Sequence, residues 1–142
     1  MQRRAITLTV LPPLFLAGCA SATLPLVHPP IGSNQVLNED LSAAPGHELI
    51  VVDLVLPPNA VGAPHSHPWE EYLYVIGGSA VLDVEGAETR TVEAGETAII
   101  PAMTIHTPRA GAEGIRAIVM RVHDEGDPLS IDAGKRDGAP KP

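Results

Sequence analysis

Three histidines and one glutamate are the residues of this sequence with the clearest capacity for chemistry. One residue separates His65 from His67, Glu71 lies four residues after His67, and His106 follows much later. In an extended segment, side chains two residues apart point to the same face. Three neutral imidazoles and a carboxylate suit Fe(II), Mn(II), Ni(II), Cu(II) or Zn(II). The spacing predicts a transition-metal site in which one strand pair presents His65, His67 and Glu71 and a later strand brings His106.

Short β-strands separated by turns must position these side chains. The chain has 142 residues, with 13 glycines, 15 prolines and only 3% aromatic residues. Short β-branched runs punctuated by glycine and proline are typical of an all-β sandwich or barrel, and no convincing window has helical periodicity. The expected strands cover residues 48–56, 71–76, 79–85, 89–93, 97–100 and 115–122.

The segment with the first two histidines resembles a motif of the cupins, a family of small β-barrels. The family motif is G-x5-H-x-H-x3,4-E-x6-G, and His65, His67, Glu71 and Gly78 stand at its spacing. Asn59 replaces the opening glycine, and asparagine also tolerates turn conformations.

The segment around the third histidine resembles the second cupin motif, G-x5-P-x-G-x2-H-x3-N. Gly95, Pro101 and His106 match this motif, whereas Met103 replaces its inner glycine and Ala110 its closing asparagine. We therefore expect the turn before His106 to differ from the family pattern.

The resemblance implies a cupin domain over residues 36–123, folded as an all-β double-stranded β-helix, or jelly-roll barrel. It also implies that His65, His67, Glu71 and His106 hold a divalent transition metal. An octahedral ion with four protein ligands keeps two positions for water, substrate or dioxygen, which suits a reaction centre. The alternative is a metal-free cupin in which these polar residues only line a pocket.

Two functions of different classes follow from this resemblance. The first is a metal-dependent enzyme of the dioxygenase type that acts on a small organic substrate. The second is a non-catalytic periplasmic protein that binds a metal or a small ligand. The family includes both, as well as isomerases and decarboxylases, and the fold alone does not choose between them. The net charge of −8 argues against a nucleic-acid partner.

The first 18 residues resemble a bacterial lipoprotein signal peptide. Arg3 and Arg4 precede an uncharged apolar run at residues 5–17, which is too short for a permanent membrane helix of roughly 20 residues. The run ends in Leu-Ala-Gly-Cys, which resembles the lipobox, and Cys19 is the only cysteine. We expect cleavage before Cys19, lipidation of its thiol and anchoring in the outer membrane, facing the periplasm. The alternative is a buried N-terminal strand with an incidental cysteine.

The segments that flank the expected cupin domain are rich in proline and polar residues. Residues 19–35 are interpreted as a tether and residues 124–142 as a flexible C-terminal tail. A single cysteine excludes an intramolecular disulfide. A lone barrel of this size has sheet edges to cover, so we expect a homodimer.

The aromatic residues of the expected domain gather beside the predicted ligands. Trp69 and Met103 are candidates for the rim of a pocket that takes a small-molecule ligand or substrate. Tyr72 and Tyr74 alternate with apolar residues, which favours the outer face of the barrel or a dimer interface.

The remaining histidines and arginines have plainer interpretations. The histidines outside the motifs are expected to be surface or structural residues; they are His28, His47 and His123. Three arginines are expected to form salt bridges, although each could instead anchor an anionic substrate; they are Arg109, Arg116 and Arg121.

Overall fold

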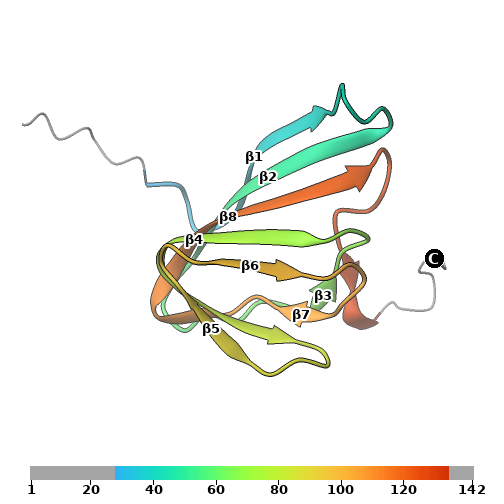
Figure 1. The fold of residues 1–142 in the computed structure, drawn as a ribbon. Coiled ribbons are helices and arrows are strands. Elements are labelled where there is room, and N and C mark those ends of the chain that lie inside the picture. The colour runs from blue at the N-terminus through green and yellow to red at the C-terminus, as the bar shows by residue number, and fades with distance from the viewer. Residues whose placement is uncertain (1–27, 135–142) are drawn as a thin grey trace, which may run out of the picture.

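The computed structural model describes residues 28–134, which form nine strands joined by turns (Figure 1). The expected signal peptide and Cys19 lie outside the described residues. Within residues 28–134, no helix is long and apolar enough to span a membrane. The strands are β1 (Gly32–Asp40), β2 (His47–Leu56), β3 (His65–Ser66), β4 (Glu71–Val84), β5 (Arg90–Glu93), β6 (Thr97–Ile100), β7 (His106–Thr107), β8 (Ala110–Asp124) and β9 (Ile131–Asp132).

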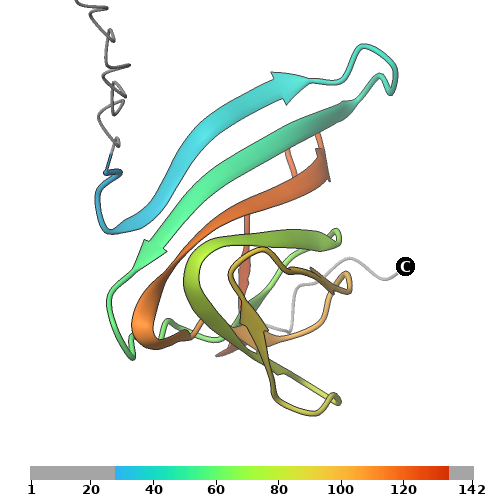
Figure 2. The ribbon, with the colours of Figure 1, turned by 60° about the vertical axis from the view of Figure 1, so that its left-hand side comes forward.

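All the strand pairs are antiparallel and belong to one continuous order, β1-β2-β8-β4-β7-β3-β9, with β5 and β6 also paired to β4. Figure 2 shows β4 and β8 bending together, so that the sheet curls into a half-barrel. The prediction of an all-β, jelly-roll type of barrel is confirmed. This curl matters for the site, because the end of β4, after its bend, pairs with β7, and β7 in turn pairs with β3.

The central strand β4 bends at a pair of glycines. Its register with β8 shifts between Val75 and Gly77 and again between Gly78 and Ala80. Before the bend β4 pairs with β6, and after it β4 pairs with β5 and then β7. The sequence predicted two separate strands here, at residues 71–76 and 79–85, because glycine pairs usually end a strand. The structure has one bent strand.

Alternating side chains of the long strands fill the interior of the curl. On β4, Leu73 and Val75 are buried whereas Tyr72 and Tyr74 are exposed, as expected for the outer face. The buried apolar residues are Ile50, Val52, Leu73, Val75, Ala80, Leu82, Val92, Ala98, Ile100, Ala110, Ile115, Ala117 and Val119. From Ile115 on, the inward positions of β8 are therefore the odd-numbered ones, and Arg121 and His123 continue this series toward the histidines.

Two strands lie partly or wholly in segments that the sequence assigned to the tether and the tail. β1 (Gly32–Asp40) pairs along β2, although its residues are mostly polar and exposed. β9 (Ile131–Asp132) pairs with β3, where Asp132 is opposite His65 and Ile131 is opposite Ser66. The described residues after β8 thus return to the strand that carries the first histidine.

Candidate metal centre

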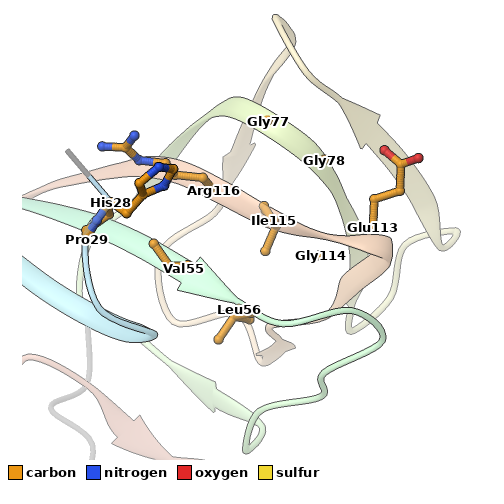
Figure 3. Close-up of a pocket in the computed structure, with 10 residues that line it drawn as sticks. All are labelled: His28, Pro29, Val55, Leu56, Gly77, Gly78, Glu113, Gly114, Ile115 and Arg116. Atoms are coloured by element: carbon orange, nitrogen blue, oxygen red, sulfur yellow. The ribbon is translucent and has the colours of Figure 1, made fainter. Parts of the chain in front are cut away.

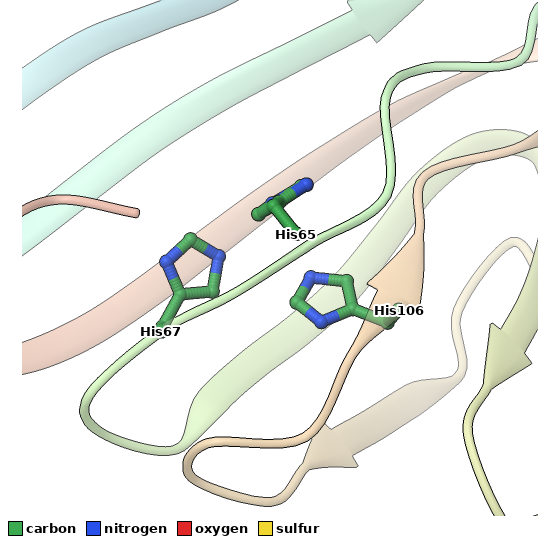
Figure 4. Close-up of side chains that lie close together, drawn as sticks. All are labelled: His65, His67 and His106. Atoms are coloured by element: carbon green, nitrogen blue, oxygen red, sulfur yellow. The ribbon is translucent and has the colours of Figure 1, made fainter. Parts of the chain in front are cut away.

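Backbone pairing between the two motifs brings the three predicted histidine ligands together. His65 in β3 is the direct partner of His106 in β7, and His67 follows β3 by one residue. His67 and His106 are buried and His65 is half-buried. One ring nitrogen from each histidine lies within 4.8 Å of the others, as the three converging rings show (Figure 4). The described domain therefore contains a histidine cluster that could hold a metal.

Each of the three imidazoles is oriented by a main-chain carbonyl. Because a carbonyl oxygen only accepts hydrogen bonds, each Nδ1 carries a proton, and in the neutral ring each Nε2 then keeps its lone pair. Metal-ligating histidines typically have this arrangement. The Nδ1–oxygen distances are 2.9 Å from His65 to Ala63, 2.6 Å from His67 to Leu129 and 3.2 Å from His106 to Thr104.

Glu71 places its carboxylate beside two of these Nε2 atoms at the start of β4. Its oxygens are 3.0 Å from Nε2 of His67 and 3.9 Å from Nε2 of His106. Burial by itself raises the pKa of Glu71, but the contacts with His67, and then with His106 and Arg121, hold this pKa below its ordinary value. The carboxylate is thus ionised and available as a ligand at neutral pH.

One pair of donor atoms has the separation expected around a divalent transition metal. Ligand atoms at right angles around an ion, each about 2.1 Å from it, lie about 3.0 Å from each other. The 3.0 Å between Nε2 of His67 and a carboxylate oxygen of Glu71 matches this separation. Both of these atoms carry lone pairs, which repel each other at this distance unless a cation or a hydrogen-bond donor contacts them both. Arg121 supplies that positive charge, because its Nη1 contacts both atoms.

Arg121 is a further residue beside the histidines, which the sequence did not assign to the cluster. From the inward face of β8, its Nη1 donates to Glu71 at 3.0 Å and to Nε2 of His67 at 3.1 Å. The expectation of a salt bridge holds, but its partner is the proposed carboxylate ligand. Arg109 and Arg116 instead pair with Asp83 and Asp53, away from the histidines. The alternation of Ile115, Ala117 and Val119 was the signal that could have found Arg121.

The two positions where the chain departs from the glycines of the cupin motifs keep a glycine-like backbone. Asn59 and Met103 both have φ of 59°, and they are the only described non-glycine residues with positive φ. The turn before His106 therefore follows a path that glycine adopts easily. The Met103 amide donates to the His67 carbonyl at 2.8 Å, which ties the second motif to the first.

The other rim candidate, Trp69, holds the segment that follows β8. Its indole nitrogen donates to Asp127 at 3.1 Å, and its ring packs edge-on against His47 at 5.7 Å between centroids. This segment supplies the Leu129 carbonyl that orients His67. Neither Trp69 nor Met103 lies in the wall of the cavity beside the histidines, and a direct role for them at a pocket rim stays a prediction.

A cavity of about 480 Å³ opens beside the histidines. Such a volume suits a small organic molecule. Its wall combines His65, His67 and Arg121 with apolar side chains from β2 and from the segment after β8. A smaller cavity of about 280 Å³ lies elsewhere, between His28, Glu113 and Arg116, and none of the three clustered histidines lines it (Figure 3).

His123 is a buried histidine of the interior that no polar group accommodates. It is 1% exposed, and neither ring nitrogen has a hydrogen-bond partner among the described residues. Burial, and then the charge of Arg121, lower its pKa below the ordinary 6.5. The folded protein therefore holds this imidazole neutral in the packed interior.

Replacing His123 by leucine is expected to reduce the loss of stability on acidification. A histidine with a lowered folded-state pKa contributes stability above its unfolded pKa, and this contribution is lost as the pH falls through the folded value. Removing the unpaired polar ring should also raise the free energy of unfolding by about 1–3 kcal/mol at neutral pH. Urea unfolding of metal-free protein at about pH 7.5 and about pH 5.5 measures both effects. An unchanged pH dependence together with a less stable variant would contradict this interpretation.

A curled antiparallel β-barrel with three converging histidines defines a class of small barrel proteins with a candidate mononuclear metal centre. The sequence model of the family described as "Cupin domain" matches residues 52–123, about half of the chain. The protein belongs to the cupin family, as the motif resemblance implied.

Solved structures show the same fold at low sequence identity. DMSP lyase DddQ from Ruegeria pomeroyi DSS-3 is 19% identical with a TM-score of 0.56, over 75% of this chain and 54% of the lyase. A deletion mutant of Bacillus subtilis oxalate decarboxylase OxdC is 19% identical with a TM-score of 0.54, over 75% of this chain and 33% of the decarboxylase. The chain thus spans about half of the first protein and a third of the second. The search among curated proteins gives no match.

Proposed function

We propose that the protein is a metal-dependent enzyme that acts on a small organic substrate, with oxidoreductase chemistry of the dioxygenase type. The observation that carries this proposal is the cluster of three histidines, in which one ring nitrogen of each lies within 4.8 Å of the others, next to the carboxylate of Glu71. His65, His67, Glu71 and His106 would hold the ion. A bound Fe(II), Mn(II) or similar ion would supply Lewis acidity and open coordination positions for substrate and dioxygen.

The protein's own residues would prepare this centre for its ligand. The carbonyls of Ala63, Leu129 and Thr104 hold the imidazoles in the tautomer that binds metal. The apolar walls of the cavity exclude water from one side of the centre and position an organic substrate. Two solved structures that share this fold, a lyase and a decarboxylase, are enzymes, which is consistent with catalysis on this fold.

A specific observation also favours the second candidate, a non-catalytic protein that binds a metal or a small ligand. Besides the proposed ligands, the ionisable side chains in the described cavity wall are Arg121 and Asp132. A guanidinium is a hydrogen-bond donor and not a base, and Asp132 is exposed. The cavity thus offers no buried acid or base beyond the ligands.

Elemental analysis of protein purified from its native compartment, without added metal, tests the metal centre. We expect about one equivalent of a single transition metal per chain, because the donor set completes one site. Native purification is needed because copper or zinc would otherwise displace the physiological ion. A metal-free protein would contradict the proposal. Oxygen consumption across a panel of small organic substrates, abolished in a His67→Ala variant, would identify the enzyme, whereas a metal-loaded but inert protein would identify the binding protein.

We also propose that the protein is a lipoprotein of the outer membrane, anchored through Cys19 and facing the periplasm. The support is the signal-like sequence ending at the only cysteine. A Cys19→Ala variant should move from the membrane fraction to the soluble fraction, and unchanged fractionation would contradict the anchor.

We further propose a homodimer that covers the outer face of β4 and β6. Tyr72, Tyr74, Ile76 and Ile99 are exposed together on this face, and Tyr72 and Ile99 are direct strand partners. Light scattering would show twice the mass of the chain, and a monomeric mass would contradict the proposal.

A further inference from the structure

Arg121 is a half-buried cation in the wall of the cavity beside the histidines. Its side chain is 12% exposed. Nη1 is shared between Glu71 and His67, whereas Nε is buried without a hydrogen-bond partner among the described residues. A buried unpaired donor on a charged group is costly. The described residues therefore satisfy this guanidinium only in part.

Charge at the centre favours an anionic ligand. Glu71 supplies one buried negative charge, which Arg121 already balances. When the imidazoles are neutral, no buried side chain in the described cavity wall compensates the two positive charges of a divalent ion. The carboxylate that this wall does contain, Asp132, is exposed. A ligand that brings its own negative charge would relieve this imbalance, whereas a neutral ligand would leave it in place.

Metal binding at His67 would leave one N–H group of Arg121 without its present hydrogen-bond acceptor. Nε2 of His67 has a single lone pair, and Nη1 of Arg121 uses it at 3.1 Å. A metal ion bound at that nitrogen takes the lone pair, so Nη1 loses this acceptor. The planar fork of a guanidinium matches a carboxylate through two parallel hydrogen bonds.

The other side chains of the cavity suit an organic tail. Four apolar residues face the same space as Arg121; they are Val52, Leu54, Leu56 and Leu129. The volume of about 480 Å³ accepts a molecule of several carbon atoms. A polar anchor at one end of an apolar cavity selects molecules with a charged head and an apolar body.

We propose that the cavity binds a small organic carboxylate, whose carboxylate group is anchored by the Arg121 guanidinium and whose apolar part packs against the β2 side chains. This assignment deepens the proposed function and rests on it, because it names the ligand class of the same site. Arg121 is the residue that determines specificity.

Calorimetric titration of Zn²⁺-loaded protein with butyrate and with butyramide tests this inference. The two probes have nearly the same shape and differ in charge. We expect butyrate to bind at least about tenfold more tightly than butyramide, and Arg121→Gln to weaken butyrate by about 10- to 100-fold while leaving butyramide unchanged. Butyrate that binds equally well to wild type and Arg121→Gln, or no better than butyramide, would overturn the inference.

Two further variants make the titration specific. Arg109→Gln removes the same charge from an exposed arginine that pairs with Asp83 outside the cavity wall, so it should leave butyrate affinity unchanged; a loss as large as that of Arg121→Gln would overturn the inference. Arg121→Lys keeps the charge but removes the planar fork, and should fall between wild type and Arg121→Gln. If Arg121→Gln does not fold, Arg121→Lys decides alone: an Arg121→Lys variant that binds butyrate as tightly as wild type overturns the assignment.

Metal content measured on each sample separates this inference from the proposed function. Metal-loaded protein whose butyrate binding is independent of Arg121 overturns the inference alone. Protein that takes up no metal contradicts the proposed function, and the same titration of the metal-free protein then decides the carboxylate site: an Arg121-dependent affinity supports it, and its absence overturns it.

Discussion

An alanine at position 106 is expected to abolish stoichiometric metal binding. His106 is buried, and it is the proposed ligand that comes from the second motif, on β7. Losing a partner that merely orients a ligand costs about 10–100-fold in metal affinity, so loss of the ligand itself should cost at least about 100-fold. Competition against a chelator of known affinity, with elemental analysis of the purified variant, measures this loss.

His47→Ala is the matched control for this variant. His47 contacts Asp124 at 3.3 Å and packs on Trp69, outside the histidine cluster. It should keep about one equivalent of metal, with an affinity close to that of wild type. Full occupancy in His106→Ala would show that the ion is held elsewhere, and equal losses in both variants would indicate a general loss of folding.

A second large effect is expected from the substitution of one glycine at the bend of β4. Gly78 has φ of +67°, and a Cβ at this position would overlap the main-chain carbonyl of Gly114 on β8. Because backbone at this crossing cannot move without breaking the β4–β8 pairing, Gly78→Ala combines conformational strain with steric overlap. We expect a loss of about 2–6 kcal/mol in the free energy of unfolding, measured by urea denaturation.

The neighbouring glycine gives a control in the same bend. A Cβ at Gly77 would meet no atom within 4 Å, and its φ is not in the left-handed region. Gly77→Ala should therefore change stability by less than about 1 kcal/mol. Similar effects for the two variants would mean that the close approach of Gly78 and Gly114 does not limit stability. The result would also explain in physical terms why the first motif ends in glycine at position 78.

The sequence predicted strands where buried and exposed side chains alternate. It did not predict strands that are defined only by backbone pairing. Leu73 and Val75 alternate with exposed tyrosines on β4, so this strand was predicted. β1 is mostly polar and exposed, and it is a strand because its backbone pairs with β2. Strands of two residues, such as β3, β7 and β9, are too short to carry any period.

The sequence by itself determined the family, the all-β class and the histidines that form the cluster, because these depend on residue types and on spacing within two short motifs. Tertiary structure alone decided which further groups reach the cluster. Arg121 contacts His67 across 54 residues of sequence, and the Leu129 carbonyl reaches His67 across 62. The direction of a side chain on β8 is set by the register of that strand with β2 and β4. Register depends on the packing of the whole sheet. The alternation on β8 groups Arg121 with Ala117 and Val119, but only the folded protein shows that this face lines the cavity.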